Sequence, residues 1–250
     1  MNKFFRIIPT LLLKDGGLVK TIKFKDPRYI GDPINIVKLF NDKEADELCL
    51  IDISATTQNK EPNYRHIEEI VSEAFMPIGY GGGIRDLRQI EKLFKLGIEK
   101  VIINNSSYID TDLISEASEQ FGSQSIVVSI DIKRNILGKF KLYRFSGSKK
   151  VGINLEDHIR RIEDSGAGEI ILNSINNDGC MEGYELELIK KVNPITNLPV
   201  ILLGGAGKKQ DLIDGINAGA SGVSAGSLFI YQGIHKAVLV SYIKNEDLFN

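Results

Sequence analysis

Short apolar runs alternate with longer amphipathic stretches along this sequence. The runs span four to eight residues and are bounded by glycine or polar residues; they are Arg6–Leu13, Glu47–Ile53, Pro77–Tyr80, Lys100–Ile103, Ser125–Ile132, Glu169–Ile175, Val200–Leu203 and Gly222–Ala225. Continuous apolar runs of this length are typical of parallel strands that are covered on both faces. We therefore expect eight buried parallel strands.

The stretches between the runs have helical periodicity. In Asp86–Leu96, for example, Leu87, Ile90, Leu93 and Phe94 recur at the spacing of one helix face. Eight strands that alternate with helices predict parallel β/α packing, and eight such units close into a barrel of about 250 residues. We therefore predict a single α/β domain over residues 1–250, a (β/α)8 TIM barrel.

An internal repeat divides this barrel into two halves. Pro77 and its glycines align with Pro199 and its glycines at an offset of 122 residues, and Gly97 and Gly219 share that offset. All β/α units resemble one another, but shared proline and glycine positions in one register favour a duplication. We expect half-barrels at about 1–122 and 123–250.

Composition and charge exclude several classes of protein. The formal net charge of −2 gives no general positive field for nucleic acid or an anionic membrane. The first apolar run is interrupted by Arg6 and Pro9, so it is too short for a membrane span and is expected to be a strand. Cys49 and Cys180 do not have the spacing of a disulfide framework, which favours a reducing cytoplasm.

Glycines and small polar residues follow four of the expected strands. The catalytic face of such a barrel lies at the carboxyl ends of its strands, where glycines let backbone N–H groups approach a phosphate. The residues concerned are Gly81-Gly82-Gly83, Asn104-Asn105-Ser106-Ser107, Gly204-Gly205-Ala206-Gly207 and Gly226-Ser227. Their repetition in both halves predicts a ligand with two phosphates, although such glycines also occur in tight turns that bind nothing.

Asp131 ends the fifth expected strand and is the main candidate for proton transfer. A carboxylate among apolar neighbours has a raised pKa and can act as a general acid or base. Its repeat partner is Leu12, and Asp52 and Asn173 near other strand ends could add polar contacts. A carboxylate that caps or tethers a loop is the alternative.

Charged residues also begin four of the strands, at the opposite end of the barrel. Arg6, Glu47, Lys100 and Glu169 are either solvated separately or joined in a salt-bridged ring, and the sequence leaves both possibilities open. The three histidines, His66, His158 and His235, fall in helical patterns and are expected at the surface.

No set of residues has metal-ligand spacing, and no dinucleotide motif or nucleophile elbow follows a strand. We therefore expect neither a metal nor an organic cofactor.

Several motifs in one order resemble the cyclase subunit of imidazole glycerol phosphate synthase, from about Phe5 to Phe229. They are KDG (14–16), GDP (31–33), DEL (46–48), GGGI (81–84), FGSQ (121–124), GAGEI (166–170), DG (178–179), GYE (183–185) and GGAGK (204–208). The resemblance implies a half-barrel duplication, two phosphate sites and a glutaminase partner on the amino-terminal face of the barrel. It places phosphate binding on Gly82, Gly83, Asn104, Asp178, Gly179, Gly204, Gly205, Gly226 and Ser227, and a catalytic carboxylate on Asp131.

In that family, ammonia from glutamine enters through a charged gate and travels along the barrel axis. The gate positions fall on Arg6, Glu47, Lys100 and Glu169. The family's second catalytic aspartate falls on Leu12, however, and leucine cannot transfer a proton. Losing one member of an acid/base pair typically costs about 10²–10⁴-fold in rate, so cyclase activity is in doubt.

The run from Thr10 to Pro33 resembles a subgroup of cyclase-like paralogues that is associated with glycosyl amidation in surface-polysaccharide clusters. This resemblance implies that ammonia passes to a third protein, an amidotransferase that acts on an N-acetyl sugar. Three interpretations remain: an ammonia-channelling subunit for amidation of such a sugar, a genuine cyclase of histidine biosynthesis, and a phospho-ligand-binding scaffold that does not channel.

Overall fold

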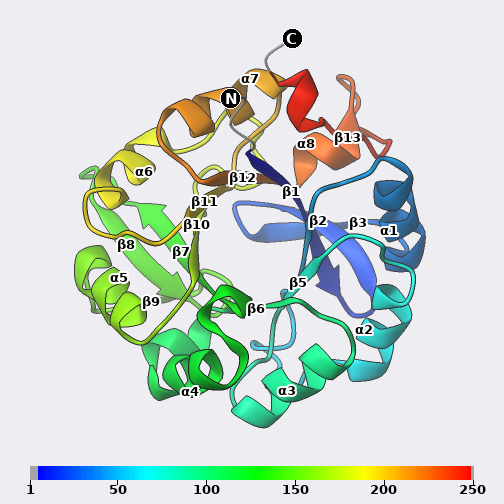
Figure 1. The fold of residues 1–250 in the computed structure, drawn as a ribbon. Coiled ribbons are helices and arrows are strands. Elements are labelled where there is room, and N and C mark those ends of the chain that lie inside the picture. Colours follow the sequence, from blue (N-terminus) through cyan, green and yellow to red (C-terminus); the bar gives the residue numbers. More distant parts are fainter. Residues whose placement is uncertain (1–4, 249–250) are drawn as a thin grey trace.

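A computed structural model describes residues 5–248 and confirms the (β/α)8 barrel. Its strands are β1 (Arg6–Lys14), β4 (Leu48–Asp52), β5 (Ile78–Gly81), β6 (Lys100–Ile103), β7 (Ile126–Arg134), β10 (Glu169–Ser174), β11 (Val200–Leu203) and β12 (Gly222–Ala225). Each pairs in parallel with its neighbours, and pairing of β10 with β7 closes the sheet (Figure 1). The predicted strand bounds differ from these by at most two residues at either end.

Helices surround the barrel and cover the outer face of the sheet. They are α1 (Pro33–Asp42), α2 (Tyr64–Val71), α3 (Leu87–Lys95), α4 (Asp112–Phe121), α5 (Leu155–Asp164), α6 (Leu186–Val192), α7 (Lys209–Asn217) and α8 (Ser227–Ile230). The helix predicted at Asp86–Leu96 is α3, where the carboxylate of Asp86 caps the first turn by accepting from the backbone N–H of Gln89. Short 3-10 helices lie at η1 (Asn105–Tyr108), η2 (Ser123–Ser125) and η3 (Asn245–Asp247).

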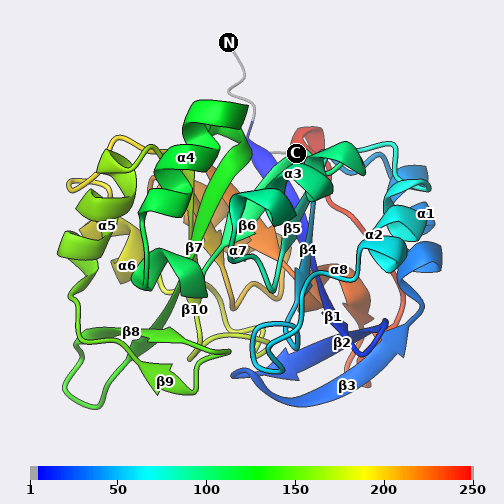
Figure 2. The same ribbon diagram turned by 90° about the horizontal axis from the view of Figure 1, so that it is seen from below.

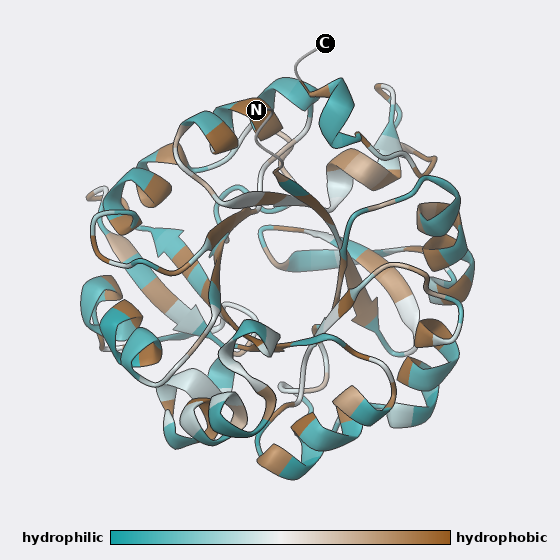
Figure 3. Ribbon diagram, viewed as in Figure 1, coloured by the Kyte–Doolittle hydropathy of each residue, from teal (hydrophilic) through white to brown (hydrophobic). Residues whose placement is uncertain are grey.

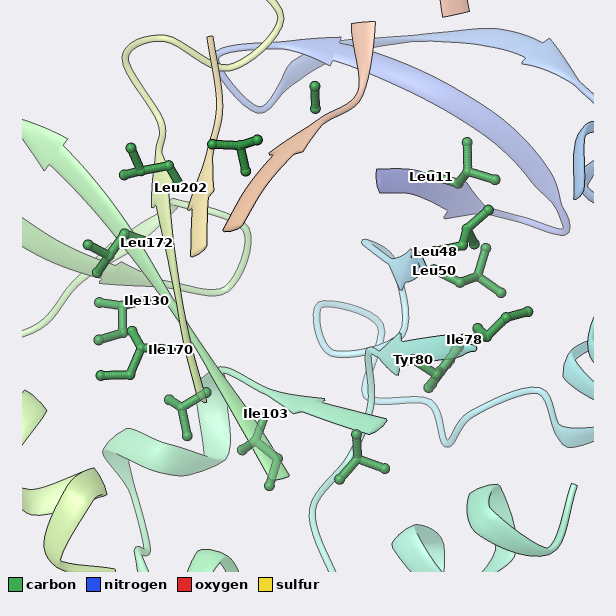
Figure 4. Close-up of a cluster of buried hydrophobic side chains, with 14 of the residues drawn as sticks. Leu11, Leu48, Leu50, Ile78, Tyr80, Ile103, Ile130, Ile170, Leu172 and Leu202 are labelled. Atoms are coloured by element: carbon green, nitrogen blue, oxygen red, sulfur yellow. The ribbon is translucent and has the colours of Figure 1, made fainter. Parts of the chain in front are cut away.

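The main core lies between the barrel and the helices. Outward-facing strand residues such as Leu50, Tyr80, Ile130 and Leu172 are buried there (Figure 4), each at most 1% exposed. Hydrophobic residues predominate in the barrel strands, whereas hydrophilic residues predominate on the outward faces of the helices (Figure 3). Burial of each large side chain contributes about 1.5–3 kcal/mol, so this layer fixes the strands that carry the site.

The eighth helix is much shorter than the sequence pattern of the other units suggests. After α8 come a small hairpin, β13 (Tyr231–Gln232) and β14 (Ala237–Val238), and an irregular segment. This segment returns to the barrel, where the Tyr242 hydroxyl donates to the backbone oxygen of Ile7 at 2.9 Å and its ring lies 5.6 Å from that of Phe229. The segment therefore covers part of the outer face that a longer helix would cover.

Two antiparallel extensions that the sequence did not predict project from the carboxyl end of the barrel (Figure 2). The first consists of β2 (Gly17–Ile22) and β3 (Lys25–Gly31) and pairs with the end of β1. The second consists of β8 (Phe140–Arg144) and β9 (Lys149–Lys150) and pairs with the end of β7. Each extension thus follows the first strand of one expected half.

The predicted half-barrels, about 1–122 and 123–250, each contain four of the barrel strands. Their outermost positions, 1–4 and 249–250, lie outside the described residues. Their origin by duplication stays a prediction.

Candidate active site and basal charged ring

A cavity of about 380 Å³ opens at the carboxyl ends of the barrel strands. It brings together the residues to which the family resemblance assigned catalysis or phosphate binding, whereas Ser107 and Gly207 of the glycine-rich and small polar segments do not line it. The assigned residues are Gly82, Gly83, Asn104, Asp131, Asp178, Gly179, Gly204, Gly205, Gly226 and Ser227, and Leu12, Asp52 and Asn173 also line the cavity. These residues therefore lie together at one end of the barrel, and their roles in catalysis and phosphate binding stay a prediction.

Backbone crowding alone requires glycine at two positions of the strand-end loops. Gly82 has φ +126°, and a Cβ there would lie 2.5 Å from the backbone oxygen of Asp52. Gly205 has φ +121°, and its Cβ would lie 2.1 Å from the backbone oxygen of Gly183. Other residues are therefore excluded by the protein's own backbone. Phosphate binding at these glycines stays a prediction, because tight packing alone accounts for their identity.

Asn104 faces the barrel interior rather than a free loop. Its side-chain amide donates to the backbone oxygen of Ser129 at 2.9 Å, and its proximity opposes the rise in the pKa of Asp131. Asn104 thus lies near the predicted proton-transfer residue, which is a placement that the sequence did not suggest.

Asp131 is 7% exposed and lies in the cavity beside the side-chain amides of Asn104 and Asn173. Burial raises the pKa of its carboxyl to about 7, although hydrogen bonds from Asn173 and Asn104 oppose this change. The Asn173 amide donates to the carboxylate at 3.3 Å. A carboxyl with this pKa exchanges protons near neutral pH, which is what general acid or base chemistry requires.

Asp52 and Asp178 are carboxylates that tether loops. Asp52 accepts hydrogen bonds from the backbone N–H groups of Ser54 and Ala55 at 2.8 and 3.0 Å. Asp178 accepts from the Thr21 hydroxyl at 2.7 Å and the Phe24 N–H at 3.1 Å, which ties the β2–β3 extension to the loop after β10. The tethering role considered for Asp131 therefore belongs to these two residues.

Leu12 lies in β1 opposite Ile51 of β4 and Val19 of β2, and its side chain lines the cavity. Its aliphatic group is half-buried, and the family resemblance implies an aspartate at this position in the cyclase subunits. The neighbouring carboxylates in the cavity, Asp52 and Asp178, are held by loop hydrogen bonds. Burial raises the pKa of Asp131 to about 7 and also raises the pKa of Asp178 above its usual value.

Sequence reasoning missed Lys20, which also lines the cavity. It is 5% exposed, and its ammonium donates to the backbone oxygen of Thr10 at 2.6 Å. Burial lowers its pKa to about 8, while the charge of Asp178 opposes the change. Lys20 lies in β2, so its position could be found only by predicting the extension that folds over the strand end.

The prediction that all three histidines lie at the surface is wrong for His158. This residue of α5 is fully buried, its ring stacks on Tyr108 with centroids 4.2 Å apart, and its Nε2 lies 3.4 Å from the Ser107 hydroxyl. Burial lowers the pKa of His158 to about 4, so the ring is neutral at pH 7. His66 is half-buried and His235 is exposed.

The four charged residues at the opposite end form a closed ring of alternating sign, defined here as the basal ring. Lys100 donates to Glu47 at 2.9 Å and to Glu169 at 3.2 Å. Arg6 donates to Glu47 at 3.3 Å and also pairs with Glu169. Burial lowers the pKa of the Lys100 ammonium, but the two glutamates outweigh that effect and raise it.

A single apolar layer separates the basal ring from the cavity. It is a buried cluster of Ile8, Cys49, Ile102, Val127, Ile171 and Ile201. Cys49, Ile102 and Ile171 also line the floor of the cavity. Above the layer, the hydroxyls of Thr10 and Ser224 hydrogen-bond at 2.6 Å across β1 and β12. The barrel axis therefore runs from a charged end through an apolar layer to a polar cavity.

Within residues 5–248 no group of three or more His, Cys, Asp or Glu side chains could hold a metal ion. None of the helices described is long and apolar enough to cross a membrane.

Comparison with known proteins identifies relatives along nearly the whole chain. The model of the histidine biosynthesis protein family matches residues 6–236. A Leptospira interrogans protein, provisionally named imidazole glycerol phosphate synthase subunit HisF, is 51% identical over 97% of this chain and 96% of its own length. A Pseudomonas aeruginosa protein with the provisional name subunit hisF2 is 48% identical over 95% of each chain.

The imidazole glycerol phosphate synthase subunit HisF of a Thermotoga species is 38% identical, with 96% of this chain and 94% of that protein covered. Because the family model and these relatives span almost the entire barrel, the chain belongs to the histidine biosynthesis protein family and is a relative of the imidazole glycerol phosphate synthase subunits.

Proposed function

We propose that this chain is the ammonia-channelling subunit of a glutamine-dependent amidation complex. A glutaminase would dock on the barrel end that carries the basal ring, and ammonia would leave at the cavity to amidate a surface-polysaccharide sugar. The closed basal ring is the observation that carries the proposal. It is supported by Leu12, which stands where the family resemblance implies the second catalytic aspartate of a cyclase.

The axis of the barrel suits neutral ammonia and opposes ions. Moving an isolated ammonium ion into an apolar environment costs several kcal/mol at least, whereas ammonia carries no net charge. Of the two ring cations, Lys100 has the more flexible stem and is 21% exposed at its side chain. Displacement of its ammonium from Glu47 and Glu169 would open the ring, and the glutamates would hold it again afterwards.

At the cavity mouth, ammonia would add to the amide carbon of the acceptor's N-acetyl group, whose oxygen the amidotransferase would activate with a nucleoside triphosphate, and that oxygen would leave with the transferred phosphoryl or nucleotidyl group. The attacking nitrogen must lose a proton, and Asp131, with its pKa near 7, could accept that proton. An N-acetyl-sugar amidotransferase would activate the acceptor, and the product would carry an acetamidino group. We infer that the glycine-rich loops bind phosphates of the acceptor.

The ring offers a direct test of channelling. In Lys100→Met, glutamine-dependent amidation should fall at least tenfold, while amidation driven by added ammonium salt should keep its wild-type rate. Lys95→Met is the matched control, because Lys95 forms an exposed pair with Glu91 on α3. Equal loss in both assays, or no loss in either, would reject the channel and favour a scaffold that binds a phosphorylated ligand without passing ammonia.

The second candidate function is that of a genuine cyclase of histidine biosynthesis. The names of the relatives favour it, and so does the pKa of Asp131, which suits acid/base catalysis. The discriminating assay supplies the bis-phosphorylated ribulosyl aminoimidazole substrate together with ammonium salt. Wild-type turnover at a rate typical of such enzymes, about 1 s⁻¹ or more, would establish the cyclase and remove the reason for a separate amidation role.

A further inference from the structure

The segment from Lys133 to Lys150 concentrates positive charge beside the cavity. It contains seven of the chain's 31 Lys and Arg residues and none of its 33 Asp and Glu residues. Its β8 and β9 project from the carboxyl end of the barrel (Figure 2). Arg134 pairs with Glu185 and Glu187. Among the described residues, the six other cations of the segment form no ion pair.

The turn between β7 and β8 presents two aliphatic side chains to solvent. Ile136 is fully exposed and Leu137 is 76% exposed. The turn is nevertheless ordered by Asn135, whose side-chain oxygen accepts from the N–H groups of Leu137 and Lys139 at 3.0 and 2.8 Å. An ordered turn that holds adjacent apolar groups in water indicates an interaction site.

A second turn adds to the same surface. Ile22, half-exposed at the end of β2, lies beside Lys23 and Lys25. Together with Asp26, Lys133, Ile175 and Asn176, these residues line a hollow of about 280 Å³, in which three lysines outnumber one carboxylate. We define the arm surface as residues 22–25 and 133–150.

The arm surface is continuous with the mouth of the cavity. Phe24 from the first extension and Phe145 and Ser146 from the second line the cavity itself. A protein that covered the arm surface would therefore also cover the opening. The proposed function requires such a cover, because ammonia released into an open mouth would be protonated and diluted by bulk water.

We propose that the arm surface is the docking site for the amidotransferase that holds the acceptor sugar. This inference rests on the proposed function. The partner would present an acidic surface to the unpaired lysines and an apolar hollow to Ile136 and Leu137. Charge complementarity of this kind steers association and fixes the register of two proteins.

A protein suits the arm surface better than a membrane does. Helices that lie on membranes bury a continuous apolar face, often with aromatic residues. The β7–β8 turn offers only two adjacent aliphatic side chains, and the nearby Phe24 and Phe145 line the cavity instead. A lipid surface would also supply no acceptor to the cavity.

The test compares two disruptive variants with one matched control. Ile136→Asp/Leu137→Asp removes the apolar contact, and Lys139→Glu/Lys141→Glu reverses charge on the same extension. Ile234→Asp is the control, because Ile234 is 92% exposed in the turn of the β13–β14 hairpin, outside the arm surface. Sedimentation velocity would follow binding of each variant to the glutaminase and to the N-acetyl-sugar amidotransferase, and circular dichroism would check folding.

Both disruptive variants should bind the glutaminase like the wild type but bind the amidotransferase at least tenfold more weakly. Their glutamine-dependent amidation should fall by a similar factor. The control should match the wild type in every assay.

Three results would overturn the docking proposal while the proposed function stands. One is wild-type affinity of both variants for the amidotransferase, and another is wild-type glutamine-dependent amidation by them. Binding of the wild type, but not of the variants, to phosphatidylglycerol vesicles would instead make the arm surface a membrane site and also overturn it. Failure of the wild-type chain to bind the glutaminase would reject the proposed function itself.

Discussion

Asp131 accepts a hydrogen bond from the side chain of Asn173 at 3.3 Å, across the adjacent strands β7 and β10. The amide favours the ionised carboxyl, but burial opposes ionisation more strongly, and the pKa therefore rises to about 7. The folded protein thus keeps a destabilising acid in its cavity. Groups held in this way are common at catalytic sites, where stability is reduced in favour of reactivity.

Asp131→Asn should make the protein more stable and less active. The pKa of Asp131 is raised from 3.8 to about 7, so its favourable contribution is complete below pH 3.8 and is lost as the pH rises to 7. Asparagine avoids that loss, and the free energy of unfolding at pH 7.5 should increase by about 1–4 kcal/mol. Urea denaturation would measure the change, and amidation should fall at least a hundredfold.

Asp52→Asn is the matched control for this substitution, because both aspartates line the cavity. Asp52 accepts two backbone hydrogen bonds, and charge-assisted bonds of this kind are stronger than those to a neutral amide. Its replacement should lower the free energy of unfolding by about 1–2 kcal/mol. If Asp131→Asn also lowered the free energy of unfolding, burial of the Asp131 carboxyl would not be destabilising.

His158 should make the protein sensitive to mild acid. Its pKa is lowered from 6.5 to about 4, so the stability that depends on the neutral ring is complete above pH 6.5 and is lost as the pH falls to 4. The free energy of unfolding should fall by up to about 3 kcal/mol between pH 6.5 and pH 4. In His158→Phe, which can keep the stacking on Tyr108, that part of the dependence should be absent.

Urea denaturation at several pH values between 4 and 7 would measure the effect of His158. His235→Gln is the control, because His235 lies exposed in the turn after β13, and its pH dependence should equal that of the wild type. If the free energy of unfolding of His158→Phe depended on pH as steeply as that of the wild type, other groups would cause the acid sensitivity.

Lys20 should make the free energy of unfolding depend on pH between about 8 and 10.5. Burial lowers its pKa from 10.5 to about 8, so its contribution is complete above pH 10.5 and is lost as the pH falls through 8. Lys20→Met should remove this dependence and raise the free energy of unfolding at pH 7 by about 1–3 kcal/mol. Denaturation at pH 7 and pH 9.5 would measure both values. If Lys20→Met instead unfolded more easily than the wild type at pH 7, the hydrogen bond to Thr10 would outweigh the cost of burying the charge.

The sequence predicts the barrel well because each strand is a buried apolar run and each helix has one apolar face. Lys100–Ile103 and Val200–Leu203 have the same bounds in the pattern and in the structure. The pattern fails where tertiary contacts decide. The β2–β3 and β8–β9 extensions contain many charged residues, and they are strands because they pair with the protruding ends of β1 and β7.

The site was predicted from the same topology, since strand ends must meet at one face of a barrel. Asp131 and the glycine loops follow from that rule. Lys20 does not, because it reaches the cavity from a hairpin. His158 was missed for a related reason: helical periodicity gives its face, but only the packing of α5 against η1 shows that this face is fully covered.

Leu12→Asp tests whether the lost carboxyl alone separates this chain from a cyclase. With the bis-phosphorylated substrate and ammonium salt, the wild type should show little turnover, and the variant should gain about 10²–10⁴-fold, the usual effect of a general acid or base. The new carboxyl would lie in a cavity that already contains Asp131, so mutual repulsion should also lower stability. Leu12→Asn is the control, because asparagine adds similar polarity without transferring a proton. Equal gain in both variants would assign the effect to polarity, and rapid turnover by the wild type would mean that another group already replaces the missing aspartate.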